Sequence, residues 1–133
     1  MNIKFISTHI ESGEKYHYKN DGKINYKDIV LPPNQQFVLK IDYPLTESAI
    51  FKFNSSPKGI TQHQLSEKIR KCYKKVYEDE DKSVGHKTSH IKGMLNRGFS
   101  DGKYGIWGHD IGDLVLVNAD ISKKNVITLC VDS

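Results

Sequence analysis

The stretch TQHQLSEKIRKCYKKVYE, residues 61–78, decides the fold. Its apolar side chains recur three and four residues apart and therefore share one face of a helix; these are Leu65, Ile69, Cys72 and Val76. Thr61 and Gln64 have the spacing of a capping box, in which each side chain accepts a hydrogen bond from the backbone N–H of the other residue. We predict a helix over residues 61–78 whose narrow apolar face packs on a flat sheet.

Strand-like segments lie on both sides of this helix. Phe37–Tyr43 and Ala49–Phe53 precede it, and the short turn between them predicts an antiparallel pair. The segments predicted as strands after the helix are Tyr104–Trp107, Leu114–Val117 and Val126–Val131, with a turn at Asp110–Asp113. The helix is expected to bury Leu65, Ile69 and Val76 against Leu39, Ile41, Ile127 and Leu129 of the strands.

The first 36 residues are predicted to add strands to this core. Residues 2–10 form the first strand, and the Asn-Asp-Gly turn at residues 20–22 joins two β-prone runs within Lys15–Lys27. Lysine and tyrosine alternate along these runs, which indicates a half-buried hairpin with one solvated face. A platform for a nucleic-acid strand is the alternative interpretation of that face. Residues 28–31 are expected to continue the sheet.

Residues 79–102 interrupt the regular pattern. The acidic run Asp79–Asp81 is predicted to leave the helix, and a short helical piece is expected over Thr88–Asn96. A connection of this length in a compact domain is usually functional or disordered. We therefore treat residues 79–102 as an insertion and as the first place to look for a site.

Length and composition are typical of one soluble domain. The chain has 133 residues, of which 37% are hydrophobic, and no apolar run approaches the ~18 residues of a membrane span. The N-terminus lacks a basic region followed by an apolar core, so no secretory signal is expected. Cys72 and Cys130 are expected to be buried, reduced thiols, which fits a cytoplasmic protein with no membrane partner.

The chain carries a formal net charge of +4 and a pI near 9.0. Almost all of the positive charge comes from lysine, because Arg70 and Arg97 are the only arginines. A nucleic-acid-binding protein more often uses arginine, whose planar guanidinium binds phosphate and guanine bidentately. We therefore expect weak, salt-sensitive binding of nucleic acid, and a protein as the main partner.

The order of predicted elements from Phe37 to Val131 is strand, turn, strand, amphipathic helix, strand, turn-rich segment and final strand. This order resembles the β-grasp fold of ubiquitin. The closing part is similar to ubiquitin's third strand, short 3₁₀ turn and last strand; the matching residues are Ile106, Gly108, Leu116, Asp120, Ile121, Lys123, Lys124, Ile127 and Leu129.

This resemblance implies an α+β fold in which one main helix crosses a mixed sheet. The length of the chain predicts one domain over residues 1–133, and the resemblance assigns residues 37–133 to the β-grasp core. Residues 1–36, a β extension that includes the hairpin, and the insertion at residues 79–102 have no counterpart in ubiquitin. Such a scaffold is commonly used for binding. Ubiquitin-type conjugation is not expected, because residues 130–133 contain no Gly-Gly.

The densest group of chemically versatile residues lies between positions 86 and 113. His86 and His90 stand four residues apart, the spacing at which two imidazoles of a helix share a metal ion, but the glutamate of the His-Glu-x-x-His pattern is absent. We therefore predict no metal site and no cofactor. The candidate catalytic residues are His90, Arg97, His109 and Asp110, and the candidate binding residues are His86, His90, Arg97, Trp107 and His109.

Two functions fit this group of residues. A histidine that titrates near neutral pH, beside an arginine for a phosphate, is what hydrolysis of RNA or a nucleotide requires. A small histidine-dependent hydrolase, or a nucleotide- or RNA-binding protein, is therefore one possibility. Because no complete catalytic motif is present, we prefer a non-catalytic protein-interaction module of ubiquitin-like fold.

Overall fold

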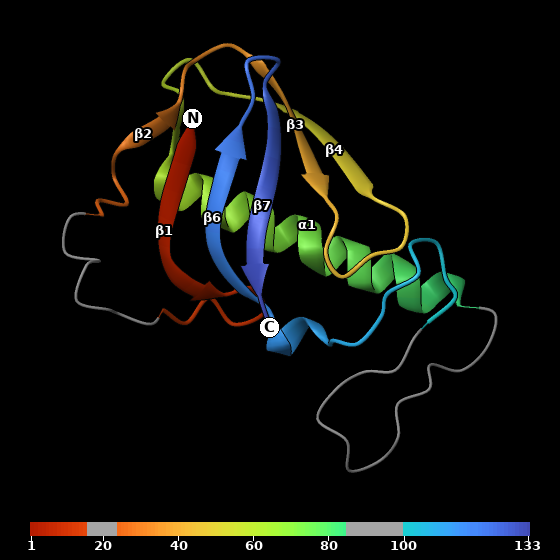
Figure 1. The fold of residues 1–133 in the computed structure, drawn as a ribbon. Helices are drawn as coiled ribbons and strands as arrows, with labels where there is room; N and C mark the ends of the chain where they lie inside the picture. The colour runs from red at the N-terminus through yellow and green to blue at the C-terminus, as the bar shows by residue number, and fades with distance from the viewer. Residues whose placement is uncertain (16–23, 85–99) are drawn as a thin grey trace.

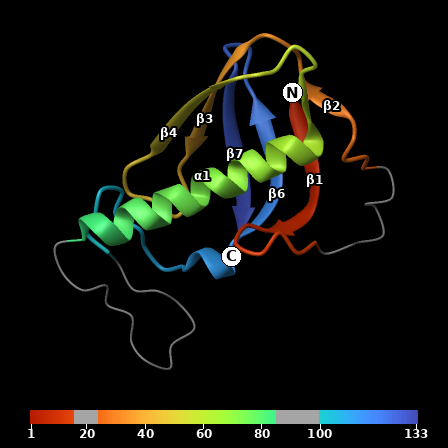
Figure 2. The same ribbon diagram turned by 180° about the vertical axis from the view of Figure 1, so that it is seen from behind.

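A computed structural model describes residues 1–15, 24–84 and 100–133 of the chain. It contains a five-stranded sheet with the order β1-β6-β7-β3-β4, and the long helix α1 lies diagonally across one face of this sheet (Figures 1 and 2). The predicted α+β class, with one main helix and a mixed sheet, is confirmed. The strands of the sheet are β1 (Asn2–His9), β3 (Gln36–Ile41), β4 (Ala49–Asn54), β6 (Val115–Ile121) and β7 (Val126–Asp132).

Strand β7 lies in the interior of the sheet, between β6 and β3 (Figure 1). It runs antiparallel to β6 but parallel to β3, with Val38 opposite Val126 and Leu39 opposite Ile127. Strands β3 and β4 pair antiparallel from end to end, as the short turn between them predicts. The sheet is therefore mixed because of a single parallel pair.

The segment that follows the loop after the helix contains a short 3₁₀ turn and a strand. Asp120 and Ile121, which are among the residues compared with ubiquitin, lie in β6. The 3₁₀ turn of the structure is η2 (Ile111–Asp113), which precedes β6 and confirms the turn predicted at Asp110–Asp113. Strands β6 and β7 are joined by a tight turn in which Asn125 N donates to the carbonyl of Ser122 at 3.0 Å.

Two predictions for the first 36 residues are wrong. Strand β2 (Ile29–Leu31) does not continue the main sheet but pairs with β5 (Ile60–Thr61) in a second, two-stranded sheet. The second run of the predicted hairpin is a turn at residues 25–28, because the side chain of Asn25 accepts a hydrogen bond from Lys27 N at 2.9 Å. The predicted hairpin turn at residues 20–22 lies outside the described residues.

Helix α1 (Gln62–Ser83) begins where the sequence predicts. Thr61 Oγ1 accepts a hydrogen bond from Gln64 N at 3.2 Å, and Gln64 Oε1 accepts one from Thr61 N at 2.9 Å. The capping box is therefore confirmed, and it satisfies backbone N–H groups that a helix start otherwise leaves without a partner.

The predicted end of α1 at Glu78 is wrong, because the acidic run belongs to the helix. Ion pairs one turn apart support it: Lys75 with Asp79 at 3.0 Å, and Lys82 with Glu78 at 2.8 Å. The last turns reach Ser83, so the insertion starts later than the sequence indicates. The short helix expected over residues 88–96 lies outside the described residues.

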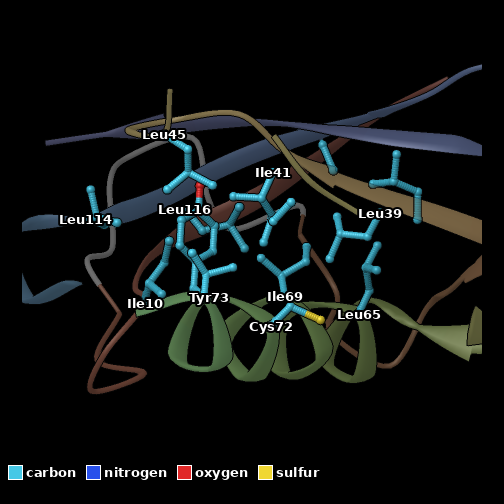
Figure 3. Packing of buried hydrophobic residues seen from close by; sticks show 14 of the residues in the cluster. Ile10, Leu39, Ile41, Leu45, Leu65, Ile69, Cys72, Tyr73, Leu114 and Leu116 are labelled. Carbon is cyan, nitrogen blue, oxygen red and sulfur yellow. The ribbon is translucent and has the colours of Figure 1, made fainter. Parts of the chain in front are cut away.

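The core lies between α1 and the face of the sheet that the helix covers (Figure 3). Leu65, Ile69 and Val76 of α1 are completely buried, as are Leu39, Ile41 and Ile127 of the strands, and Leu129 packs at the margin of the same cluster. The predicted helix-on-sheet packing is confirmed. Burial of side chains of this size contributes roughly 1.5–3 kcal/mol each.

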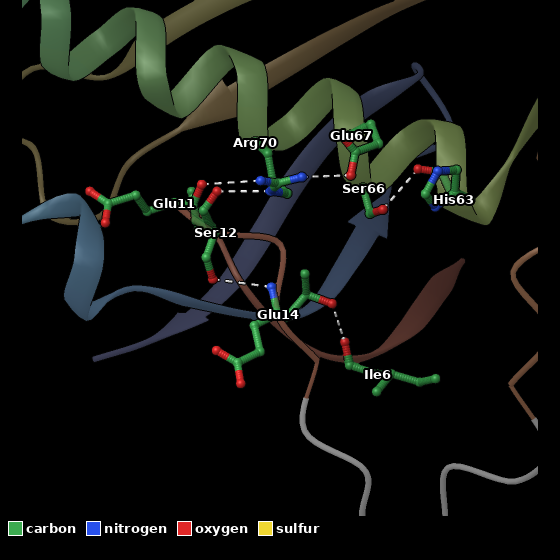
Figure 4. Close-up of polar contacts among 10 residues, drawn as sticks. Ile6, Glu11, Ser12, Glu14, His63, Ser66, Glu67 and Arg70 are labelled. Atoms are coloured by element: carbon green, nitrogen blue, oxygen red, sulfur yellow. Dashed lines mark hydrogen bonds and ion pairs between the residues drawn. The ribbon is translucent and has the colours of Figure 1, made fainter.

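Arg70 joins α1 to the turn that follows β1 (Figure 4). Its Nε and Nη2 atoms donate to the carbonyls of Ile10 and Glu11 at 2.9 and 3.1 Å, while Nη1 binds Glu67 at 2.7 Å. Gly13 has a φ of +77°, and a Cβ at this position would lie 2.7 Å from the guanidinium. Glycine is therefore required where the turn passes under Arg70.

Cys72 and Cys130 are both free thiols. Cys72 is buried, as predicted, but the expectation that Cys130 is buried is wrong. Side chains alternate across a strand, and Cys130 lies on the face of β7 opposite to Leu129 and Val131, which pack on the core. Within the described ranges, no helix is long and apolar enough to cross a membrane.

Candidate functional site

Residues 100–107 form a loop, and the strand predicted at Tyr104–Trp107 is wrong apart from one bridge between Leu45 and Ile106. The reason is Glu80, which lies completely buried near the end of α1. Its carboxylate accepts hydrogen bonds from Ser100 Oγ (2.6 Å) and from the backbone N–H groups of Gly102 (2.9 Å), Tyr104 (2.8 Å), Gly105 (3.1 Å) and Ile106 (3.3 Å). Backbone N–H groups that would otherwise bind a neighbouring strand therefore all bind the side chain of Glu80.

The environment of Glu80 keeps this carboxylate charged. Burial by itself would raise the pKa of Glu80, but the hydrogen bonds from Ser100, Tyr104, Gly102 and Ile106 outweigh it, so the pKa lies below its ordinary value of 4.5. The loop also approaches closely, since a Cβ on Gly102 would lie 2.7 Å from the Glu80 carboxyl group. Glu80 therefore fixes the conformation of the loop from the last turns of α1.

A second set of hydrogen bonds fixes the loop from the side of the β3–β4 connection. Trp107 N donates to the carbonyl of Pro44 at 3.1 Å. Glu47 N donates to the carbonyl of Tyr104, and Thr46 N to the carbonyl of Gly105, both at 2.9 Å. The backbone that carries Trp107 is thus held by two separate parts of the fold.

Tyr43, Trp107 and His109 form a cluster of rings that we call the aromatic patch. The Trp107 side chain, the only tryptophan of the chain, is 43% exposed. Its ring packs at 85° to the ring of Tyr43, with the centroids 5.5 Å apart, and the His109 ring lies 5.8 Å from Tyr43 on a tilted plane. The patch therefore presents the Trp107 indole to solvent, with Tyr43 and His109 half-buried beside it, from a backbone held by hydrogen bonds.

His109 is oriented by groups from three elements. Its Nε2 lies 3.2 Å from Ser133 Oγ, and this hydroxyl is 2.7 Å from the hydroxyl of Tyr43. Its Nδ1 is buried, finds no hydrogen-bond partner in the described part of the chain, and lies 3.8 Å from the carboxylate of Asp113. The imidazole is therefore held at one edge while the other edge faces a carboxylate beyond hydrogen-bond distance.

Two tyrosines of α1 support the patch from the core. Tyr73 donates its hydroxyl to the carbonyl of Tyr43, and Tyr77 donates to the carbonyl of His109, each at 2.8 Å. Burial is the main reason that the pKa of Tyr73 is raised far above its ordinary value, so this hydroxyl remains a donor. The ring positions of the patch are thus tied to the helix that defines the core.

The arrangement of Asp113, His109 and Ser133 has the order of a nucleophile activated by a histidine. The distances are longer than such a relay requires, because Asp113 lies 3.8 Å from the imidazole. Asp113 Oδ2 instead accepts a hydrogen bond from Asp110 N at 3.3 Å, at the start of η2. Among the residues that the structure describes, no group of three His, Cys, Asp or Glu side chains is placed to hold a metal ion.

The structure brings together some of the candidate residues. Trp107, His109 and Asp110 are neighbours at this end of the molecule, whereas His86, His90 and Arg97 lie outside the described residues. The sequence reasoning missed Tyr43 and Ser133, whose contacts join positions far apart in the chain, and the anchoring residues Glu80, Tyr73 and Tyr77. A signal for Glu80 exists, because it follows Val76 by four residues and so continues the buried face of the helix.

In comparisons with known proteins, no family model, no curated protein and no solved structure matches the chain significantly. The interpretation of the site therefore depends on its geometry.

Proposed function

We propose that the protein is a non-catalytic protein-interaction module that binds its partner through the aromatic patch. The observation that carries this proposal is the 43% exposure of Trp107 on a loop whose backbone is held by Glu80 and by the carbonyl of Pro44. Tryptophan and tyrosine are the residues most enriched among those that dominate binding energy at protein interfaces. A rigid backbone lowers the entropic cost of ordering such residues on binding.

The fold supports the same proposal. Apart from β5, which belongs to the small sheet, the elements from β3 to β7 follow the order strand, strand, helix, strand, strand. Ubiquitin-like β-grasp proteins have this order, although the strand after the helix is β6 and not the predicted Tyr104–Trp107. We propose that the core belongs to this class of fold, with β1 as an additional strand beside β6. A fold suggests a function only by association, so the weight of the proposal rests on Trp107.

We also propose a cytoplasmic location. The support is chemical, since Cys130 is an exposed free thiol and such thiols persist in a reducing compartment. We further predict that the protein binds nucleic acid only weakly and that added salt abolishes this binding, because lysine and not arginine supplies most of the positive charge.

Affinity capture with a matched pair of variants tests the interaction function. Trp107→Ala should lose the partner, whereas Ile29→Ala should retain it, because Ile29 is a similarly exposed apolar residue (59%) on the remote strand β2. With the captured partner purified, Trp107→Ala should weaken binding by about 2 kcal/mol or more, roughly 30-fold. A specific partner that binds Trp107→Ala as tightly as the parent would refute the proposed binding site.

The second candidate function is a histidine-dependent hydrolase or a nucleotide- or RNA-binding protein. The observation in its favour is the 3.2 Å separation of Ser133 Oγ and His109 Nε2. We test it with ester and phosphodiester substrates and by calorimetric titration with nucleotides and zinc, using the parent, His109→Ala and Ser133→Ala. We expect neither turnover nor binding. Turnover that disappears in His109→Ala, in a variant that melts like the parent, would favour the enzyme.

A further inference from the structure

The part of the chain that contains Trp107 is acidic, although the whole chain is basic. Residues 104–122 contain Asp110, Asp113 and, at the far end of β6, Asp120, but neither lysine nor arginine; Lys103 and Lys123 flank this stretch. Residues 49–75, by contrast, contain Arg70 and many lysines against Glu67 as their only acid. Charge is therefore distributed unevenly along the chain, and the net value of +4 does not describe the surroundings of the aromatic patch.

Three aspartates are close to residues of the aromatic patch, one in space and two in sequence. Asp113 lies 3.8 Å from the His109 ring, and the exposed Asp132 immediately precedes Ser133, whose hydroxyl contacts both Tyr43 and His109. Asp42 precedes Tyr43 in sequence; its side chain is 55% exposed, and its Oδ1 accepts a hydrogen bond from Ser48 Oγ at 2.5 Å. Lys40 approaches Asp42 at 3.9 Å, but both side chains of this pair are solvated, so it offsets little of the negative potential.

The ring geometry of the aromatic patch also favours the binding of a cation. Tyr43 and Trp107 pack at 85°, and in such an edge-to-face pair each ring keeps at least one face that the other ring does not cover. The face of an aromatic ring is its electron-rich side, and tryptophan binds cations most strongly. The exposed indole and the carboxylate of Asp113, which lies beside His109, thus attract the same kind of group.

We infer that the partner presents a cationic side chain, an arginine within a basic segment, to the exposed face of Trp107. This inference rests on the proposed interaction function and specifies the chemistry of the partner. Arginine fits better than lysine because its planar guanidinium stacks on an aromatic face and is weakly hydrated, while its N–H groups remain available to carboxylates. Asp113 lies beside the His109 ring, and Asp132 and Asp42 are the sequence neighbours of Ser133 and Tyr43; these are the carboxylates that we assign as acceptors.

The local potential is measured through Trp107 itself, because it is the only tryptophan of the chain. Quenching of its fluorescence by caesium and by iodide is compared at equal ionic strength, each normalised to free N-acetyltryptophanamide. The normalised caesium constant should exceed the iodide constant. Asp132→Asn should reduce this difference, whereas Asp120→Asn should not, since Asp120 pairs with Asn2 at the opposite end of the sheet.

Binding is measured with three flexible Gly/Ser peptides that differ at two positions, which are arginine, its uncharged analogue citrulline, or glutamate. The arginine peptide should bind most tightly and weaken with added salt. The citrulline peptide should bind at least about tenfold more weakly, a difference of about 1.4 kcal/mol. Calorimetry with Trp107→Ala should show a similar loss for the arginine peptide, while Ile29→Ala should bind it like the parent.

The outcomes separate this inference from the function on which it rests. Three results would contradict the proposal that the partner presents a cationic side chain. These are equal quenching by the two ions, equal affinity for the arginine and citrulline peptides, and no binding of the arginine peptide at millimolar concentration. Arginine binding unchanged by Trp107→Ala would overturn the assignment to the indole. None of these results would alter partner capture by the parent and its loss in Trp107→Ala, which judges the proposed function separately.

Discussion

The carboxylate of Glu80 and the hydroxyl of Ser100 lie 2.6 Å apart, and both side chains are buried. This contact joins the last turns of α1 to the loop that carries Trp107. Because the same carboxylate also binds backbone N–H groups of residues 102–106, one side chain connects the core of the protein to its candidate binding surface.

Glu80→Gln should destabilise the protein strongly. Glutamine offers one acceptor oxygen, and its NH₂ group would face N–H donors of the loop, so several buried donors lose their partner. Each buried group left unsatisfied costs about 1–3 kcal/mol. Urea unfolding of the variant measures the loss. Glu78→Gln is the matched control, because it removes only a solvent-exposed ion pair with Lys82 and should cost far less stability than Glu80→Gln. Equal stability of the two variants would contradict the anchoring role of Glu80.

The stability contributed by Glu80 should disappear in acid. Its pKa in the folded protein lies below the ordinary value of 4.5, so the unfolded chain binds the proton more readily. The contribution is therefore complete above pH 4.5 and is lost as the pH falls below that value toward the folded pKa. Unfolding free energies of the parent and of Glu80→Gln, measured across this range, should converge at low pH. A difference between them that does not depend on pH would show that the charge of Glu80 is unimportant.

The two thiols should react at very different rates. Cys130 is exposed, whereas Cys72 is buried and burial raises its pKa, which lowers its thiolate fraction. Ellman's reagent should therefore modify Cys130 rapidly in the native protein and Cys72 only when the protein unfolds. Cys130→Ser should show no rapid phase, and Cys72→Ser should keep it. Rapid reaction of both thiols in the native protein would contradict the position of Cys72 in the core.

Ile69→Ala should test the contact between the helix and the sheet. Ile69 is completely buried in the cluster that includes Leu39 and Ile127. Its truncation leaves a cavity and should cost about 2–5 kcal/mol of unfolding free energy. Lys74→Ala, on the exposed face of the same helix, should change stability by less than about 0.5 kcal/mol. Chemical denaturation of both variants measures these two losses. Similar stabilities of the two variants would contradict the packing of Ile69 between the helix and the sheet.

The parts of the fold that the sequence predicts correctly depend on local signals. The spacing of Leu65, Ile69 and Val76 determines the buried face of α1, and the Thr61–Gln64 capping box determines its start. These patterns need only neighbouring residues to be recognised. The short connection between Phe37–Tyr43 and Ala49–Phe53 predicts their pairing for the same reason.

The wrong predictions concern residues whose partners are distant. Tyr104–Trp107 has the composition of a strand, but its backbone donors bind Glu80, which the sequence places in an acidic run. The candidate site was found only in part because His109 reaches Ser133 and Tyr43 through tertiary contacts. Local composition contains no information about such pairs.

The interior position of β7 has a consequence for the order of folding. β3 and β4 can form a hairpin early, but Val38 of β3 meets its parallel partner Val126 only after α1 and the following loop have been placed. Closing a segment of this length costs entropy before the contact is gained. We therefore expect the sheet to become complete late, with the rate of folding limited by the docking of β7 between two strands that are already in position.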